Sequence, residues 1–178
     1  VALTFNCTYS AQDLHQLLEI LKEKNVHATF FVSDTWAKTI RKLLCTIHNA
    51  GHDIGGLWTT QASLSIREQT LTLENLTQRI DRLTDSETTL FRFEDGNYDN
   101  SAIRLIQEAG GYPVQWNINP WTGKTTGTGH PPSDFKQSPT PKRLYPPVPC
   151  RNCLYRTGAS RLIDNLEDQG ISQFPSPS

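Results

Sequence analysis

The first residues with reactive potential in this chain are Asn6, Cys7 and Thr8, which follow a short apolar stretch. Residues 1–5 read VALTF and predict a buried strand, because apolar and β-branched side chains favour strands. In α/β proteins, ligands and catalytic groups gather just past the carboxyl ends of parallel strands. The position therefore indicates a site, and a thiol nucleophile is one chemistry that Cys7 could supply.

A thiol nucleophile needs a neighbouring base, and no histidine has a spacing that pairs it with Cys7. His52 lies at the start of a predicted strand and is better explained as a hydrogen-bonded core histidine. We therefore interpret Cys7 as a small buried side chain.

A group of carboxylates offers a second chemistry, a metal site built from oxygen ligands. Its members are Asp53, Glu94, Asp95 and Asp99. Residues 94–100 lack the spacing of a calcium-binding loop, so a turn followed by a helix capped by Asp99 or Asn100 explains them better.

The elements that must position these residues alternate between strand and helix. The predicted helices are 11–25, 36–50, 65–84, 99–109 and 159–169, and the predicted strands are 1–5, 26–34, 52–57, 89–93, 113–118 and 153–156. Repeated alternation of this kind predicts parallel βαβ units, arranged as a doubly wound sheet or a barrel.

The length of 178 residues predicts a single domain over 1–178. Within it, residues 119–149 are rich in proline and glycine and predict an irregular excursion. Residues 175–178 predict a loose tail.

Charge and cysteine content limit which partners and which cellular compartment are plausible. Seventeen basic and eighteen acidic residues give a net charge of −1, which argues against nucleic acid as a partner, and no apolar run is long enough for a membrane span. Cys150 and Cys153 form one CxxC, which could be half a zinc site, a redox pair or a short-loop disulfide; we favour a disulfide or inert thiols. The chain begins inside a strand with neither Met nor a signal peptide, so we expect a trimmed or mature fragment. Two glycosylation sequons, at Asn6 and Asn75, are near the number expected by chance; the compartment stays open, and a secreted or cell-surface protein is the favoured interpretation. We also expect a monomer.

Five stretches of the sequence together resemble the polysaccharide deacetylases of carbohydrate esterase family 4, the NodB-homology family that includes chitin deacetylases. The family motif Thr-Phe-Asp-Asp-Gly-Pro corresponds here to TFNCTY, and its Gly-His-Glu-Ile-Gly-Asn-His-Thr-x-x-His corresponds to GHDIGGLWTTQ. The five stretches are 4–9, 26–32, 51–61, 91–96 and 111–119. The resemblance implies an α/β fold, a distorted (β/α) barrel with fewer than eight strands.

The resemblance also implies where the family chemistry should lie. The family binds zinc or another divalent metal through one aspartate and two histidines, and the corresponding positions here are Cys7, Leu57 and Gln61. A second aspartate acts as the general base, and Asn6 stands in its place. The nearest equivalent of the general-acid histidine is Tyr155.

These replacements predict a protein without a metal cofactor and without the family activity. Leu57 has no donor atom, Gln61 offers only a neutral amide, and a lone Cys7 does not hold an ion. Asn6 cannot accept a proton at neutral pH. The prediction is therefore a catalytically inactive family member, associated with chitin or another cell-wall polysaccharide. A divergent metal-dependent deacetylase or amide hydrolase with a rearranged site, and a structural or interaction protein without a glycan ligand, remain as alternatives.

Two further expectations concern the space that the lost site would leave. Arg92 corresponds to the family arginine that orients the catalytic aspartate, and we expect it to bond to Glu94, Asp95 or Asp53 instead. Aromatic and polar residues expected near the mouth of the barrel could either form a groove for sugar rings or plug the emptied cavity, and we favour the plug. This set comprises Tyr9, Asp53, Trp58, Glu94, Asp95, Tyr98, Trp116 and Trp121.

Overall fold

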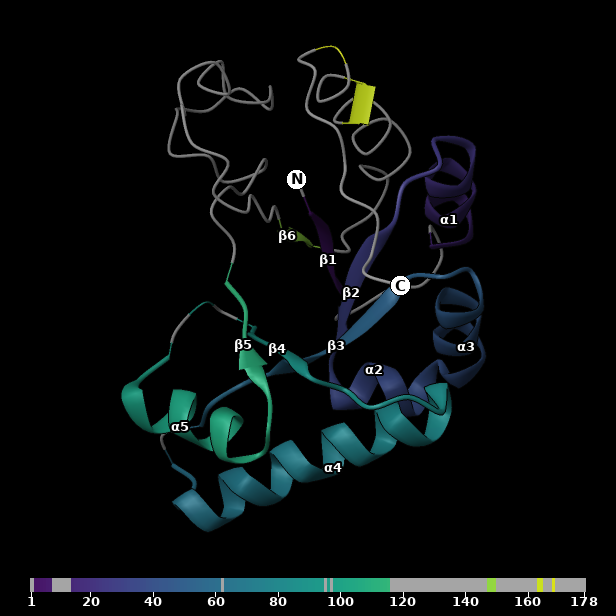
Figure 1. The fold of residues 1–178 in the computed structure, drawn as a ribbon. Helices are drawn as coiled ribbons and strands as arrows, with labels where there is room; N and C mark the ends of the chain where they lie inside the picture. Colours follow the sequence, from purple (N-terminus) through teal and green to yellow (C-terminus); the bar gives the residue numbers. More distant parts are fainter. Residues whose placement is uncertain are drawn as a thin grey trace.

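The fold is built around a sheet of six parallel strands in the order β5-β4-β3-β2-β1-β6 (Figure 1). The structure, a computed structural model, describes residues 2–7, 14–61, 63–94, 96, 98–115, 163, 164 and 168, and the backbone alone of 147–149. The strands are β1 (Leu3–Cys7), β2 (Ala28–Val32), β3 (Asp53–Trp58), β4 (Leu90–Phe93), β5 (Tyr112–Pro113) and β6 (Pro147–Pro149). The predicted α/β fold class with a parallel sheet of fewer than eight strands is confirmed for this part of the chain.

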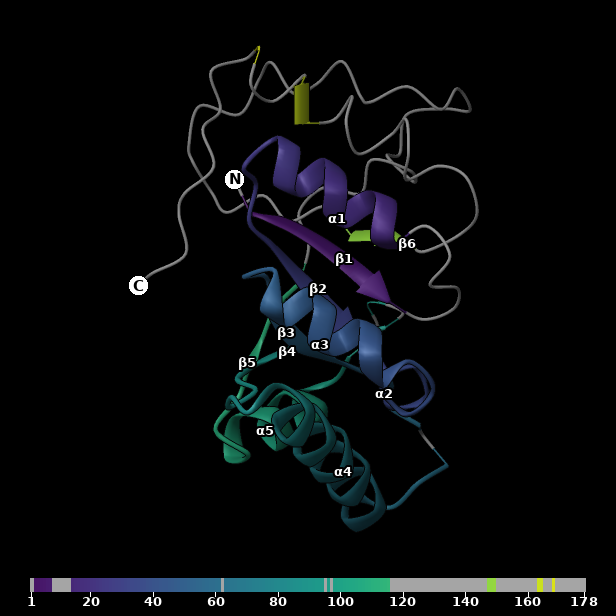
Figure 2. The same cartoon turned by 90° about the vertical axis from the view of Figure 1, so that its right-hand side faces the viewer.

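The helices are amphipathic and lie against the sheet on the side seen in Figure 2. They are α1 (Leu14–Glu23), α2 (Asp34–Thr39), α3 (Arg41–Asn49), α4 (Ile66–Thr84) and α5 (Asn100–Glu108). Ser65 and Glu68 form a reciprocal capping box at the start of α4, and Asp99 caps α5 through the amide of Ala102, at 2.7 Å. Among these helices, none combines the length and the apolar character that crossing a bilayer requires.

Two elements differ from the sequence prediction, and a third falls outside the described residues. The helix expected over 36–50 is two helices, because Ile40 leaves helical geometry with φ −125° and ψ 49°. The strand expected over 113–118 is shorter within the described residues, where it covers only Tyr112 and Pro113. The predicted strand 153–156 lies outside the described residues.

The expected irregular excursion 119–149 lies outside the described residues except at its end, where Pro147–Pro149 form β6 beside β1 and Pro147 pairs with Thr4. Two prolines are compatible with a strand here because β6 occupies the edge of the sheet and pairs on one side only.

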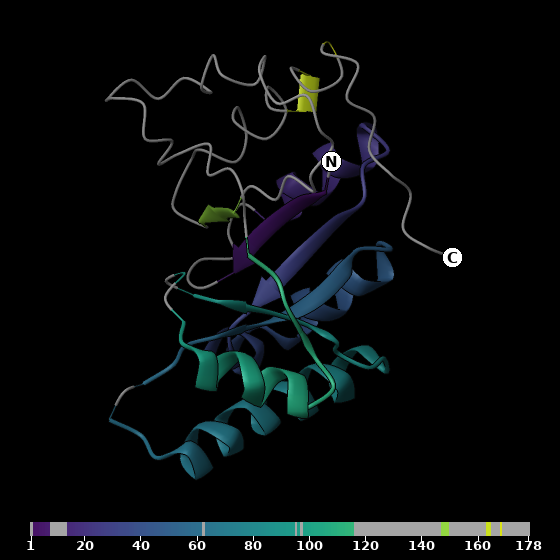
Figure 3. The ribbon, with the colours of Figure 1, turned by 60° about the vertical axis from the view of Figure 1, so that its left-hand side comes forward.

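Alternate residues of each strand face opposite sides of the sheet. Leu3, Phe5 and Cys7 of β1 belong to the apolar core under the helices, a surface that we call the helix-covered face. Thr4 and Asn6 lie between them and face the other way, where Arg92 of β4 contacts both. We call this second surface the inner face of the sheet (Figure 3).

Two glycines of strand β3 leave space for aromatic rings from the neighbouring strands. A Cβ atom on Gly55 would lie 2.7 Å from the Phe31 ring, and one on Gly56 would lie 2.7 Å from the Phe91 ring. Both separations are too short for real carbon contacts. Glycine at these two positions therefore lets one ring pack over each face of β3.

Candidate functional site

Three of the residues predicted to mark the site come together on the inner face, near the carboxyl ends of the strands. Asn6 is the next-to-last residue of β1, and Arg92 is the next-to-last residue of β4. Leu57 lies in register with Arg92 on the neighbouring strand β3. Because all these strands are parallel, their carboxyl ends meet at one edge, as the sequence predicted.

Arg92 forms the centre of this group and is completely buried, with 0 % of its surface exposed. Its Nη1 donates hydrogen bonds to Thr4 Oγ1 at 2.9 Å and to Asn6 Oδ1 at 3.0 Å. Its guanidinium carbon lies 4.0 Å from the centroid of the Phe31 ring, a cation–π distance. Its Nε also donates to the Val114 carbonyl at 3.4 Å. These four contacts come from β1, β2 and the residue after β5.

These contacts show that the sheet is strongly curled. Strands β4 and β1 are separated by β3 and β2, and three strand spacings amount to about 14 Å in a flat sheet. One arginine side chain could not reach Asn6 across that distance. The inner face is therefore concave, as in a barrel.

The expected bonds from Arg92 to Glu94 or Asp53 are replaced by the contacts to Thr4 and Asn6. Glu94 accepts a hydrogen bond from Thr59 Oγ1 at 2.5 Å. Asp53 was wrongly placed in the site, because it begins β3 and so lies at the opposite edge of the sheet. Asp95 lies outside the described residues, so its part of the prediction stays a prediction.

Cys7 lies next to Asn6 in sequence but faces the other side of the sheet. Its side chain is 0 % exposed and belongs to the apolar cluster under the helices, with Phe5 and Phe30. A thiol in that position is shielded from solvent and from substrates. The geometry agrees with a small core residue and opposes a nucleophile.

The donor set at the family metal positions does not fit a divalent ion. Leu57 is a buried hydrocarbon side chain, and Cys7 faces away from the inner face. Gln61 is exposed beyond the end of β3, where its backbone carbonyl accepts hydrogen bonds from Leu64 N and Gln69 Nε2. Throughout the described ranges, no three His, Cys, Asp or Glu residues are grouped as a metal would require. We therefore derive no metal-dependent step from this site.

Trp58, which was predicted to line a groove or plug the mouth, packs on the helix-covered face instead. Its Nε1 donates to Thr72 Oγ1 of α4 at 3.1 Å, and its ring lies 5.9 Å from that of Phe93. Tyr98 stacks on Phe93 at 5.3 Å and is 53 % exposed, so it belongs to the same side. The physical reason is strand alternation: Trp58 and Phe93 lie one residue away from Leu57 and Arg92.

Several predicted site residues lie outside the described residues, and their roles stay predictions. They are Tyr9, Asp95, Trp116, Trp121 and Tyr155.

The sequence interpretation missed Thr4 and Phe31 as partners of Arg92. Alternation could have indicated Thr4, because it lies two residues before Asn6 and therefore on the same face.

Comparison with known proteins agrees with this architecture. The sequence profile described as "Polysaccharide deacetylase" matches residues 1–114. A curated relative from Geobacillus stearothermophilus, an uncharacterized 30.6 kDa protein in the fumA 3′ region, is 27% identical over 125 residues, which cover 66% of this chain and 46% of the relative. The chain thus spans about half the length of this relative.

Solved structures show the same fold. BA3943 of Bacillus anthracis, called a CE4 family pseudoenzyme, superposes with a TM-score of 0.78 at 20% identity, over 95% of this chain and 60% of that one. A family 4 carbohydrate esterase from Bacillus anthracis superposes with a TM-score of 0.74 at 26% identity, over 96% of this chain and 77% of that one. The profile match covers well over half of the 178 residues and includes every strand of the site except β6. The chain therefore belongs to the polysaccharide deacetylase family.

Proposed function

We propose that this chain is a catalytically silent polysaccharide deacetylase homologue that associates with a carbohydrate of the cell wall or cell surface. The observation that carries the proposal is the hydrogen bond from Arg92 Nη1 to Asn6 Oδ1. The family places a carboxylate base at this position, and here an amide that cannot accept a proton occupies it. The arginine that would orient the base is retained, but it binds a neutral acceptor.

The metal positions support the same conclusion. Family chemistry requires an ion that lowers the pKa of bound water toward neutrality and polarises the carbonyl group. Leu57 supplies no ligand to the inner face, and Cys7 directs its sulfur into the apolar core. A rearranged metal enzyme would need a new ligand cluster, and the part of the chain that is described contains none.

The likeness to BA3943 adds support from outside the site. A mutant of that protein is described as a pseudoenzyme with restored enzymatic activity. A silent member of this fold can therefore keep a scaffold on which activity can be rebuilt. We propose that the present chain keeps its scaffold for binding and that it acts outside the cell.

The test has two arms that use the full chain. In the first, metal content is measured after equilibration with zinc, and acetate release is measured with N-acetylchitooligosaccharides and acetylated xylan. The proposal expects neither stoichiometric metal nor turnover; stoichiometric zinc with turnover would establish the rearranged enzyme. The comparison variant is N6D/L57H/Q61H, in which three family residues are reinstated without burying a carboxylate at position 7, and metal binding is expected to rise.

The second arm measures sedimentation of the protein with insoluble chitin and with peptidoglycan. Retention of the unmodified chain on one of these polymers is expected. If neither polymer retains it, the structural protein without a glycan ligand becomes the better assignment.

A further inference from the structure

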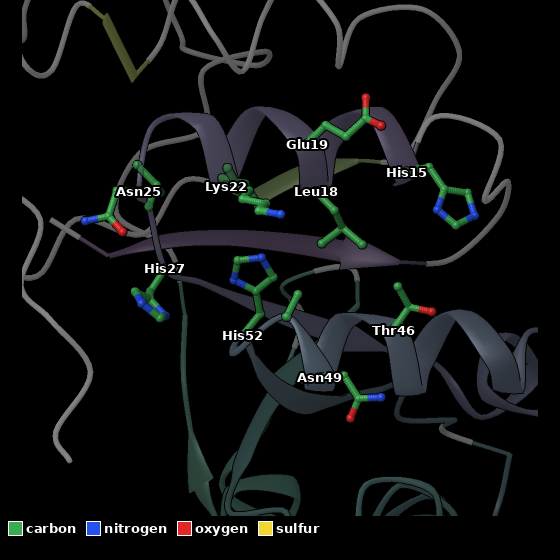
Figure 4. A pocket seen from close by; sticks show the side chains of 12 residues that line it. His15, Leu18, Glu19, Lys22, Asn25, His27, Thr46, Asn49 and His52 are labelled. Carbon is green, nitrogen blue, oxygen red and sulfur yellow. The ribbon is translucent and has the colours of Figure 1, made fainter.

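A cavity of about 510 Å³ lies between α1 and α3, well away from Arg92 (Figure 4). Its floor includes Leu18, Leu21 and Val26, and its rim includes Lys22 and Asn49. A volume of this size suits a small organic ligand. The cavity runs along α1 from His15 to Lys22 and meets the carboxyl-terminal end of α3 at Thr46 and Asn49.

His52 is the polar group at the base of this cavity. Figure 4 shows its ring rising between the two helices toward Leu18. The side chain is 6 % exposed, and Nδ1 has no hydrogen-bond partner within the described part of the chain. Buried polar atoms in native proteins nearly always have a partner, so the unpaired nitrogen beside this cavity offers a hydrogen-bonding position to a group from outside the chain.

The environment of His52 defines the partner that its ring can take. Burial lowers the pKa of His52 to about 4, and the nearby His27 ring, 6.1 Å away between centroids, acts in the same direction. The imidazole is therefore neutral at pH 7, with one nitrogen able to donate and the other able to accept. A hydroxyl group can serve either nitrogen, because it both donates and accepts.

The charges around the cavity do not favour an ionic ligand. Glu19 and Lys22 carry opposite charges and offset each other, so the lining offers no net charge that would select an anion or a cation. A purely apolar ligand would leave the buried Nδ1 of His52 unpaired, whereas the exposed amides of Asn25 and Asn49 can bind either water or a ligand. The combination of an apolar floor, amides and a neutral imidazole suits an uncharged ligand that carries hydroxyl or amide groups and has an apolar face.

We propose that this cavity binds an uncharged sugar unit, with His52 hydrogen-bonded to one of its hydroxyl groups. The site lies outside the inner face and does not depend on whether the family chemistry is lost. The carbohydrate association proposed above is used only to choose which sugars are tested.

The experiment is a titration of the ¹⁵N-labelled full chain with N-acetylglucosamine and with N,N′-diacetylchitobiose, followed by NMR. Saturable shifts are expected at the amides of Lys22, Asn49 and Ala50 and at the ring of His52. Sodium acetate and tetramethylammonium chloride are the charged control probes, and neither should reproduce these shifts.

Two variants make the assignment specific. Asn49→Trp fills the exposed rim without touching the core and should weaken binding at least tenfold, whereas Asn75→Trp on the exposed side of α4 should leave it unchanged. His52→Phe should also weaken binding, with circular dichroism confirming that the fold is kept. Absence of saturable shifts, equal shifts with acetate, or unchanged affinity in Asn49→Trp would overturn the proposal. Because none of these readouts involves metal or turnover, failure here is distinguishable from failure of the proposed catalytic silence.

Discussion

Arg92 on β4 and Asn6 on β1 are hydrogen-bonded at 3.0 Å although two strands separate them in the sheet. The bond is therefore a brace across the concave inner face. It joins residues 86 positions apart in the chain, and both ends are buried. The contact is part of what holds the sheet curled.

The first prediction tests this brace. Asn6→Leu removes the acceptor while keeping a similar volume, so the buried guanidinium loses a partner. We expect the free energy of unfolding to fall by about 1–3 kcal/mol, measured by urea denaturation. Asn6→Asp restores an acceptor with a charge, and it should lose less than Asn6→Leu. Equal stability of the leucine variant and the unmodified chain would contradict the brace.

The second prediction concerns the orientation of Cys7. Cys7→Asp would bury a carboxylate in the apolar core under the helices. We expect a loss of more than about 3 kcal/mol or failure to fold, because an uncompensated buried charge is costly. Cys7→Ala is the matched control and should be tolerated. If the aspartate variant were as stable as the alanine variant, the side chain would have to face the concave side.

The third prediction is a dependence of stability on pH that arises from His52. Burial lowers its pKa from 6.5 to about 4, so the unfolded chain binds the proton more readily than the folded one. Stability should therefore fall on acidification from about pH 6.5 to about pH 4 and lose nothing further from this group below that range. The shift sets an upper limit of about 3 kcal/mol.

Thermal or urea unfolding at several pH values measures this effect. His52→Phe should flatten the slope between pH 6.5 and 4, whereas His15→Gln, a change at an exposed histidine, should leave it in place. A slope that persists unchanged in His52→Phe would show that another group is responsible.

The fourth prediction separates Trp58 from any sugar-binding role at the mouth. Trp58→Phe removes the hydrogen bond to Thr72 on α4, and Thr72→Val removes its acceptor. Each change should cost about 1 kcal/mol, and the double variant should cost less than their sum, because both remove the same bond. Sedimentation with chitin should not change. If Trp58→Phe lost polymer binding while its stability stayed unaltered, Trp58 would have to take part in sugar binding at the mouth of the barrel.

Much of the fold could be predicted from the sequence, because each strand and helix has a strong local pattern. The leucines of α1 recur on one side with helical spacing, and Ser65 with Glu68 marks the start of α4 as a capping box. The split at Ile40 could not be predicted, since its residues continue the helical period. β6 was missed because prolines argue against a strand until its edge position is known.

The site was predicted less well, for a geometrical reason. Motifs give the order of residues near a strand end, but a shift by one residue changes the face of the sheet. Asn6, Leu57 and Arg92 were placed together correctly, whereas Cys7 and Trp58, each adjacent in sequence to one of them, face the helices. The partner of Arg92 depends on how far the sheet curls, which is a tertiary property with no local signal.

Along β1 and β3, alternate side chains face the helices and the concave side, and this affects which substitutions such a protein can accumulate. Phe5, Gly56 and Trp58 are fixed by packing under the helices, while Asn6 and Leu57 alternate with them on the concave side. Substitutions on the concave side leave the apolar contacts of their neighbours intact. An enzyme of this design can lose its reaction one residue at a time and still fold, and the same separation would let a new use be selected on an old framework.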